Sequence, residues 1–353
     1  MPNIIEVKNL KKAYFEHSGK VVGTDGRFKH VMAIALDPSR EYKEGVIRCI
    51  TSREGDVEVS GYIDRSEIFR VSMKDSLEHF SIGEQLKMQN EDIIISELSK
   101  FGNLSSDFIG FEDPDLFFDE RAKLLHLYFT MPFLITRGDE KHAVVHLGHA
   151  VGRDLSSLEI TEPVLMAEMN EFGQPGAKEL SVVPINKQGV RLNLVESSKK
   201  EKDFTYSTVR IAIAENMGKL WKFGETVFHP KEHKIPWIGG HASPGPLFSR
   251  EFIDVGEGKL LGIINGREAN KKVGNKTKYG MFSVGLFIYD YENGKIDWVS
   301  PEPLIRDSEA KTITFASQFI QTKNGEGILY AHVDDSFVRA YTLYADKLKN
   351  IIP

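Results

Sequence analysis

Apolar residues along the chain are concentrated in short runs that are rich in β-branched and aromatic side chains. The clearest runs are 124–130, 142–147, 208–214, 259–265, 281–290 and 327–333. Turn residues such as Gly, Asn and Asp lie between the runs, for example at 256–258, 292–294 and 323–325. Runs of this length between turn residues are typical of β-strands. The pattern therefore predicts a β-rich protein.

The longer stretch 82–101 has a spacing closer to that of an amphipathic helix. Its apolar residues are Ile82, Leu86, Met88, Ile93, Ile94, Ile95 and Leu98, an imperfect match to a helical period. We expect a helical insertion or linker here, between two sheets. A shorter helix over 75–80 is a second expectation.

Similar segments recur along the chain and divide it into units. One set comprises 154–165, 218–228 and 294–305, and another comprises 112–118, 242–248 and 315–320. Their spacing fits five units, at 20–75, 108–170, 175–230, 240–305 and 312–353. Four-stranded units arranged radially avoid long exposed sheet edges. We therefore predict an all-β fold, a five-bladed β-propeller that forms a single domain over 1–353, with the N-terminal strand joining the last blade.

Composition and charge narrow the function classes. The 353 residues are 41% hydrophobic and 27% charged, and the net charge of −6 gives no overall basic field for nucleic acid. The single cysteine, Cys49, excludes an intrachain disulfide and cysteine-rich metal sites. No apolar run reaches the roughly 18 residues of a membrane helix, and the first residues contain no apolar signal-peptide core. We expect a cytoplasmic protein without a nucleic-acid or membrane partner; its oligomeric state stays open.

Three carboxylates lie close together where a strand is expected: Glu112, Asp113 and Asp115. Because alternate residues of a strand share a side, Asp113 and Asp115 are expected to face a central channel and Glu112 to point the other way. Pro114 disfavours a helix at this position. Pairs of carboxyl groups supply the acid and the base that cleave glycosidic bonds. The alternative is a turn whose acidic side chains are only solvated.

The Glu112-Asp113-Pro114 segment, followed by an apolar strand containing 127–130 (Leu-Tyr-Phe-Thr), resembles the Glu-Asp-Pro-Arg segment of glycoside hydrolase family 130. That family comprises mannoside phosphorylases and hydrolases on a five-bladed β-propeller. From about residue 105 onward, the repeats are also similar to those of the related propeller families 43, 32 and 68. The resemblance implies that Asp113 is the general acid. Asp115 stands where the family has Arg, so this position cannot supply the family's positive charge.

A segment rich in Gly and Pro, 239–248, contains His241 and Ser243. It is not a serine-hydrolase elbow, because Pro244 follows the serine and has no backbone N–H to donate to an oxyanion. On an inner strand of a propeller, His241 and Ser243 would share a face and could bind sugar hydroxyls. The alternative is a rigid loop.

The strand predicted at 259–265 leads into Arg267 and Glu268. We predict Glu268 as the second carboxylate of the site, and Arg267 as a residue that orients a carboxylate or a substrate oxygen. The alternative is a surface ion pair. Further candidate substrate-binding residues, from the first and fifth units, are Arg48, Gln318 and Asp25.

Several histidines lie near one another in the sequence, but we predict no metal site. On a strand, His142 and His146 would share a face while His149 opposes them, so three ligands do not converge. Pro follows His229, so the segment that ends at His233 is not an HExxH motif. A structural ion in the channel is conceivable, but we expect these histidines to be hydrogen-bonded within strands and loops. No cofactor is predicted, because no dinucleotide-binding or Walker-type loop occurs.

Together these observations predict a glycoside hydrolase that acts on a short oligosaccharide or glycoside in a central polar pocket. Asp113 would be the general acid or proton relay and Glu268 its partner, with Glu112 or Asp115 adjusting the charge. One alternative is a glycoside phosphorylase, which needs cations around a phosphate. The other is a non-catalytic carbohydrate-binding propeller, because a fold does not fix a function.

Overall fold

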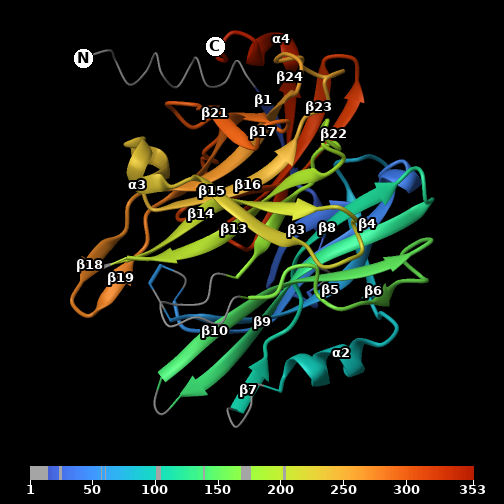
Figure 1. The fold of residues 1–353 in the computed structure, drawn as a ribbon, viewed down its shortest axis with the longest axis vertical. Coiled ribbons are helices and arrows are strands. Elements are labelled where there is room, and N and C mark those ends of the chain that lie inside the picture. Colours follow the sequence, from blue (N-terminus) through green and yellow to red (C-terminus); the bar gives the residue numbers. More distant parts are fainter. Residues whose placement is uncertain are drawn as a thin grey trace.

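The computed structural model describes residues 15–23, 26–56, 58–59, 61–100, 105–137, 140–167, 176–201 and 204–353. Most of these residues belong to strands of curled, largely antiparallel sheets (Figure 1). The prediction of a β-rich protein is confirmed.

Two five-stranded sheets come first along the chain. The first sheet has the order β2-β6-β5-β4-β3. Its strands are β2 (Val22–Gly23), β3 (His30–Leu36), β4 (Glu44–Glu54), β5 (Ile63–Met73) and β6 (Phe80–Gln85). In the second sheet, β9 pairs with β10, β8 and β7, and β11 lies beyond β10. Its strands are β7 (Ser105–Phe108), β8 (Glu112–Asp119), β9 (Leu124–Arg137), β10 (Glu140–Gly152) and β11 (Glu159–Ile160).

The third sheet has eight strands and consists of two four-stranded parts. The first part comprises β12 (Lys178–Ser181), β13 (Arg191–Lys200), β14 (Thr205–Ala214) and β15 (Lys222–Phe228). The second part comprises β16 (His241–Leu247), β17 (Lys259–Arg267), β20 (Phe282–Asp290) and β21 (Lys295–Val299). A single parallel residue pair between β14 and β16, Ser207 with His241, joins the two parts.

The last sheet contains the first and the last strands of the described chain. Its order is β1-β24-β23-β22, with β1 (Phe15–Lys20), β22 (Thr314–Lys323), β23 (Glu326–Val333) and β24 (Phe337–Tyr344). The predicted pairing of the N-terminal strand with the last unit is confirmed by the antiparallel ladder between β1 and β24. A separate hairpin, β18 (Lys271–Val273) with β19 (Lys276–Lys278), projects from one side of the molecule (Figure 1).

Five strands, which we call the inner strands, lie next to one another in a closed series. They are β3, β8, β12, β16 and β22; each contacts the next, and β22 contacts β3. Each inner strand also carries an inserted residue relative to its hairpin partner, a β-bulge. At three of these bulges a non-glycine residue has a positive φ: Ala33 (49°), Asp113 (46°) and Glu179 (52°). Such a backbone is strained and persists only where the surrounding structure holds it.

Apolar side chains fill the space between neighbouring sheets. One cluster joins the first two sheets through Val46, Ile68, Leu127 and Phe129. Another joins the first sheet to the last through Ile34, Ile47, Tyr330 and Val338. Burying a side chain of this size contributes roughly 1.5–3 kcal/mol, so these clusters hold the sheets around the inner strands.

Helices are few in the described residues, and the predicted helix is shorter than expected. Only α2 (Glu91–Leu98) is helical within 82–101, and it lies between β6 of the first sheet and β7 of the second. Residues 80–85 form a strand because Phe80 and Ile82 are buried on one side and pair with β5. The expected helix over 75–80 is absent. The remaining short helices are η1 (Pro38–Arg40), α3 (Pro230–His233), η2 (Pro236–Ile238) and α4 (Ala345–Leu348).

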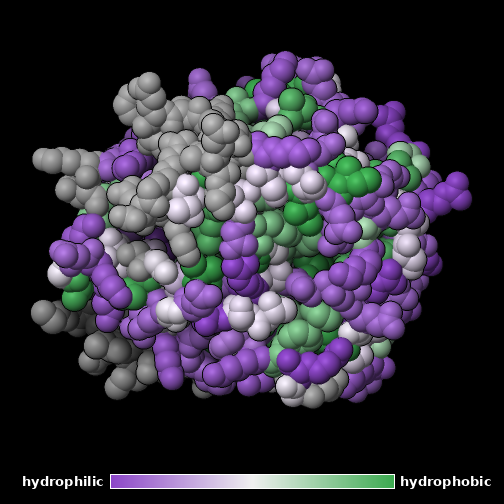
Figure 2. All heavy atoms as spheres, turned by 90° about the horizontal axis from the view of Figure 1, so that it is seen from below, coloured by the Kyte–Doolittle hydropathy of each residue, from purple (hydrophilic) through white to green (hydrophobic). Residues whose placement is uncertain are grey.

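The face shown in Figure 2 is covered mainly by hydrophilic residues, with hydrophobic residues in smaller groups between them. In the part of the chain that the structure describes, no helix combines the length and the apolar character needed to cross a membrane.

Candidate functional site

Charged side chains gather at the beginnings of three inner strands. Glu112 and Asp113 open β8, Lys178 and Glu179 open β12, and His241 opens β16. The prediction that Glu112 and Asp113 point to opposite sides is wrong, because both carboxylates bind the same arginine. The bulge in β8 explains this result: an inserted residue interrupts the alternation of side chains along a strand.

Arg48 on β4 is the centre of the first half of this cluster. Its Nη1 donates to Asp113 Oδ1 at 2.7 Å, its Nη2 to Glu112 Oε1 at 2.7 Å, and its Nε to Ser66 Oγ at 2.9 Å. Burial raises the pKa of Glu112 to about 7; Arg48 opposes this shift and neighbouring Asp113 adds to it. The arginine therefore holds two carboxylates close together in a nearly buried position.

Glu196 on β13 is the centre of the second half. Its carboxylate accepts a hydrogen bond from His241 Nε2 at 2.9 Å and lies 3.4 Å from Lys178 Nζ. Burial alone would raise the pKa of Glu196, but His241 and Lys178 outweigh it and hold this pKa well below its usual range. Burial lowers the pKa of His241 to about 4, so the neutral imidazole is a donor to Glu196.

Glu179 differs from the other carboxylates of the cluster. Burial raises its pKa well above the usual range, nearby Asp113 raises it further, and Lys178 only partly opposes this. No described cation forms an ion pair with Glu179. Burial therefore favours the protonated form of Glu179, next to an Asp113 that is ion-paired with Arg48.

Aromatic rings and a buried arginine lie beside His241. The guanidinium of Arg267 lies 4.2 Å from the centre of the Tyr279 ring and 5.0 Å from that of Phe282. The His241 ring meets Phe282 edge-on at 4.8 Å. Among the described residues, Arg267 has no carboxylate partner within ion-pair distance, and its Nε has no hydrogen-bond partner. Burial lowers the pKa of Arg267. Its Nε is free to donate to a ligand, because it has no partner among the described residues.

The cluster thus contains several residues that the sequence singled out, namely Arg48, Glu112, Asp113, His241 and Arg267. Sequence reasoning missed Lys178, Glu179 and Glu196. One signal was available: Lys178 and Glu179 begin the third unit just as Glu112 and Asp113 begin the second. An alignment of the unit beginnings would have placed these two pairs at equivalent bulges.

Glu268, the predicted second carboxylate, is not brought to the cluster. Its side chain is 43% exposed and forms an ion pair with Arg306 at 2.9 Å. It lines a separate surface pocket together with Pro236 and Pro303. The surface ion pair, which was the alternative interpretation, describes this residue.

Two predicted sugar-binding side chains are used inside the protein. Gln318 Nε2 donates to the Leu36 carbonyl at 2.9 Å, and its Oε1 accepts from the Leu36 N–H at 2.6 Å. Ser243 is fully buried, so a sugar cannot reach its hydroxyl. Asp25 lies outside the described residues.

Asp115 lies on β8 beyond the cluster and lines a different cavity. Its pKa is raised to about 7 by burial, which the hydrogen bond from the Leu116 N–H only partly offsets; no charge of the cluster contributes. Asp115 therefore does not share the electrostatic surroundings of Asp113.

Two of the histidines considered as metal ligands are hydrogen-bonded within the second sheet, as expected. His149 contacts His126 at 2.9 Å and Thr161 at 2.8 Å, and His146 accepts from the Ala167 N–H at 3.0 Å. Burial lowers the pKa of His146 to about 4, so this ring is neutral at pH 7.

The fold is that of the β-propeller glycosidase-like proteins, as the sequence resemblance implied. No protein-family model matches the chain, and no curated protein matches its sequence. Three solved structures show the likeness of fold. β-1,2-Mannobiose phosphorylase from Listeria innocua has a TM-score of 0.57 at 13% identity, over 96% of this chain and 93% of that one.

The other two structures are similar to this chain over nearly its whole length. A GDP-Man-dependent mannosyltransferase from Leishmania mexicana has a TM-score of 0.54 at 11% identity, over 97% of this chain and 94% of that one. A glycoside hydrolase has a TM-score of 0.53 at 11% identity, over 98% of this chain and 96% of that one. At such identities the likeness describes the fold and not the reaction.

Proposed function

We propose that this protein hydrolyses a glycosidic bond in a short oligosaccharide or glycoside, with Asp113 and Glu179 as its two catalytic carboxyl groups. The observation that carries the proposal is the contrast in their surroundings. Arg48 donates to Asp113 at 2.7 Å, while Glu179 has no ion-pair partner among the described residues and burial raises its pKa. Cleavage by two carboxyl groups requires one of them protonated and the other ionised at the same pH.

The contrast also suggests the role of each group. Glu179 would protonate the leaving oxygen, because burial raises its pKa and favours its protonated form. Asp113 would be the base or the nucleophile, because it is ion-paired with Arg48 at 2.7 Å. The family resemblance implies the acid role for Asp113; the ion pair with Arg48 is our reason to prefer the reverse. His241, Lys178 and the Tyr279 ring would contact the sugar.

Hydrolysis is favoured over phosphorolysis by the state of the nearby cations. Arg48 already binds two carboxylates, and Lys178 faces Glu196. A phosphate ion would have to compete with these buried anions. Phosphorolysis remains the second candidate because Arg267 has no carboxylate partner among the described residues, and because one protein of similar fold is a named phosphorylase.

We also propose that the sheets form five blades of one domain. The support is the closed series of contacts through β3, β8, β12, β16 and β22, together with a bulge in each of these strands. The eight-stranded sheet would then be two blades, since only one residue pair joins its two parts.

The reaction can be tested with an NMR time course on a panel of glycosides and short oligosaccharides, with and without phosphate. Free sugar in both samples is the expected result, and the anomer formed first reports the stereochemistry. Sugar phosphate formed only when phosphate is present would identify a phosphorylase instead. The absence of any product would favour a carbohydrate-binding protein.

Matched substitutions test the assignment of the carboxyl groups. We expect Asp113→Asn and Glu179→Gln each to lower kcat by about 100-fold or more, as for loss of a general acid or base. Glu268→Gln is the comparison, and kcat should change less than about twofold because this carboxylate lies outside the cluster. A large loss in Glu268→Gln together with full activity in Glu179→Gln would contradict the proposal.

A further inference from the structure

A cavity lies farther along the inner strands than the charged cluster. It has a volume of about 190 Å³. The cluster uses the first residues of β8, β12 and β16, whereas the cavity is lined by later residues of the same strands. Its lining includes Asp115, Leu180, Pro246 and Phe319 from four of the inner strands, and Pro38, which follows β3. All five inner strands or the turns that follow them therefore contribute to it.

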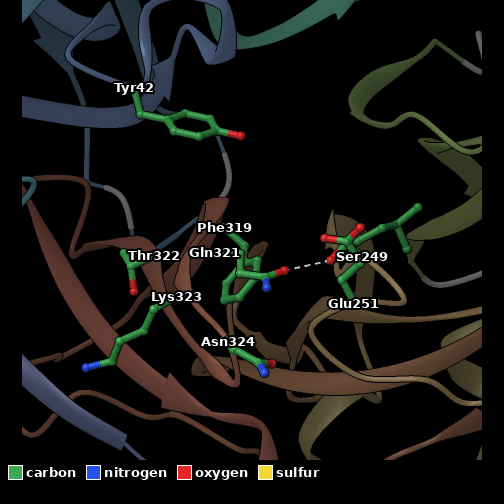
Figure 3. Close-up of a pocket in the computed structure, with 9 residues that line it drawn as sticks. Tyr42, Ser249, Glu251, Phe319, Gln321, Thr322, Lys323 and Asn324 are labelled. Carbon is green, nitrogen blue, oxygen red and sulfur yellow. Dashed lines mark hydrogen bonds between the residues drawn. The ribbon is translucent and has the colours of Figure 1, made fainter.

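This inner cavity adjoins a larger one of about 610 Å³, and both are lined by Tyr42, Leu247 and Phe319. Figure 3 shows the larger cavity, with the Tyr42 ring on one side and Phe319 and Gln321 on the other. Gln321 is held by a hydrogen bond from Ser249 Oγ at 2.8 Å. The Tyr42 and Phe319 rings therefore border both the larger cavity and the inner cavity that contains Asp115.

Asp115 and the Tyr42 hydroxyl are the polar side-chain groups of the inner cavity that remain available to a ligand. The other polar side chains of the lining are used within the protein: Ser181 donates to Gly245, Ser317 to Ile34, and Gln318 to Leu36. No described side chain donates to the Asp115 carboxylate, and burial raises its pKa to about 7. The Asp115 side chain is half-buried and reaches the cavity, so a cation from solution can form an ion pair with it.

The charge around the two cavities favours a cation. Of the charged side chains that line them, Asp115 and Glu251 have no ion-pair partner among the described residues. Lys323 is already paired with Glu326 at 2.9 Å. A single carboxylate offers too few oxygens for a calcium or magnesium ion, and it offers too few hydrogen bonds to specify a neutral sugar. Aromatic rings near a carboxylate suit an organic cation.

We propose that this cavity binds a small organic ammonium ion, with Asp115 as its counter-ion and the rings of Tyr42 and Phe319 against its alkyl groups. The site is separate from the glycosidase cluster, and it does not depend on the reaction proposed there.

Calorimetric titration of the whole protein with choline tests this proposal, with 3,3-dimethylbutan-1-ol as the neutral compound of the same shape. Saturable choline binding at millimolar concentration, at least about tenfold tighter than binding of the alcohol, is the expected result; tenfold corresponds to about 1.4 kcal/mol. Equal binding of both compounds, or no binding of choline, would overturn the proposal.

Two variants locate the site. Asp115→Asn should weaken choline binding at least about tenfold, whereas Asp113→Asn, two residues earlier on the same strand and ion-paired with Arg48, should leave it unchanged. The opposite pattern would place the cation in the charged cluster and overturn the assignment. Nuclear Overhauser contacts between the choline methyl groups and the Tyr42 or Phe319 ring protons provide a check in the unaltered protein, and their absence would also count against it.

Discussion

At the scale of single residues, the site depends on how Arg48 shares its charge. A planar guanidinium can bind two carboxylates in fixed directions, which a lysine cannot do equally well. Arg48 uses this geometry to hold Glu112 and Asp113 on consecutive positions of β8. Glu179 differs from these two, because no described cation forms an ion pair with it and burial raises its pKa.

Replacing this arginine should affect both stability and the pH profile. In Arg48→Met, two nearly buried carboxylates lose their cation, and we expect the free energy of unfolding to fall by about 3–5 kcal/mol. The pKa of Glu112, which Arg48 lowers, should rise further because this carboxyl group loses its cation. The acidic limb of kcat/KM should therefore move to higher pH. Denaturant unfolding and a pH–rate profile measure the two effects.

Arg65→Met is the matched control for this substitution. Arg65 forms an ion pair with Asp107, but the two side chains are 40% and 52% exposed. An exposed pair of this kind contributes about 0–1 kcal/mol. Equal destabilisation by Arg48→Met and Arg65→Met would mean that the Arg48 cluster is not a buried ion-pair network.

Sequence patterns identified about half of the residues in this cluster. Whether a residue could be found depended on whether its partners lie near it in the chain. The group from Glu112 to Asp115 was visible because three carboxylates are adjacent in the chain. Glu196 was not visible, because its meaning comes from Lys178 and His241, which reach it from different strands. Glu268 was misleading, since a strand end adjacent to Arg267 can face either the site or the solvent.

At the scale of elements, the bulges decide which side chains meet. A regular strand would present either Glu112 or Asp113 to Arg48, and one inserted residue presents both. The alternation rule therefore failed at the position where the charged side chains gather. The same rule holds within β6, where Phe80 and Ile82 are buried. The sequence pattern there predicted a helix, because the apolar residues of 82–101 also fit a helical spacing.

Gly110, just before β8, fixes the approach of this strand to the first sheet. Its φ is +114°, and a Cβ at this position would lie 1.8 Å from the Ser66 carbonyl oxygen. Ser66 in turn accepts a hydrogen bond from Arg48. Gly110→Ala should therefore destabilise the protein by at least about 3 kcal/mol, through overpacking and backbone strain, and should lower activity. Thermal unfolding measures the loss of stability, and kcat measures the loss of activity.

Gly189→Ala is the control that distinguishes the two effects expected in Gly110→Ala, namely backbone strain and steric crowding. Gly189 also has a positive φ, +85°, but a Cβ there would have no neighbour within 4 Å. This variant should lose only about 1–2 kcal/mol. If both alanine variants unfold at the same temperature, the close approach of Gly110 to Ser66 is not important for stability.

At the scale of the whole molecule, the first and last sheets are joined by side chains as well as by strand pairing. Gln318 on β22 binds both the N–H and the C=O of Leu36 on β3. Gln318→Met should leave these backbone groups without partners and cost about 2–4 kcal/mol, with little change in KM. Chemical denaturation and steady-state kinetics distinguish this from the sugar-binding role that the sequence suggested.

Gln321→Met on the same strand is the comparison for Gln318. Gln321 accepts one hydrogen bond from Ser249 in an exposed setting, so its loss should cost under about 1 kcal/mol. A large rise in KM for Gln318→Met with unchanged stability would restore the substrate-binding interpretation.

Much of the architecture was predictable because inner strands recur with similar sequences. The repeated segments 112–118, 242–248 and 315–320 coincide closely with β8, β16 and β22. The inner strands β3 and β12 were not recognised as members of this set. β12 has only four residues, Lys178–Ser181, which are too few for a pattern. In β3 nearly every residue is buried, so its apolar residues do not alternate with polar ones.

The ladder between β1 and β24 has a mechanical consequence. Phe15 at the start of β1 pairs with Leu343 near the end of β24, and Lys20 pairs with Arg339. A force applied between Phe15 and Tyr344 therefore acts at one end of this antiparallel ladder and across its hydrogen bonds. Such a load opens the residue pairs one after another, as in a zipper, and does not shear them together. Under tension between these residues, the last sheet would give way first along this seam.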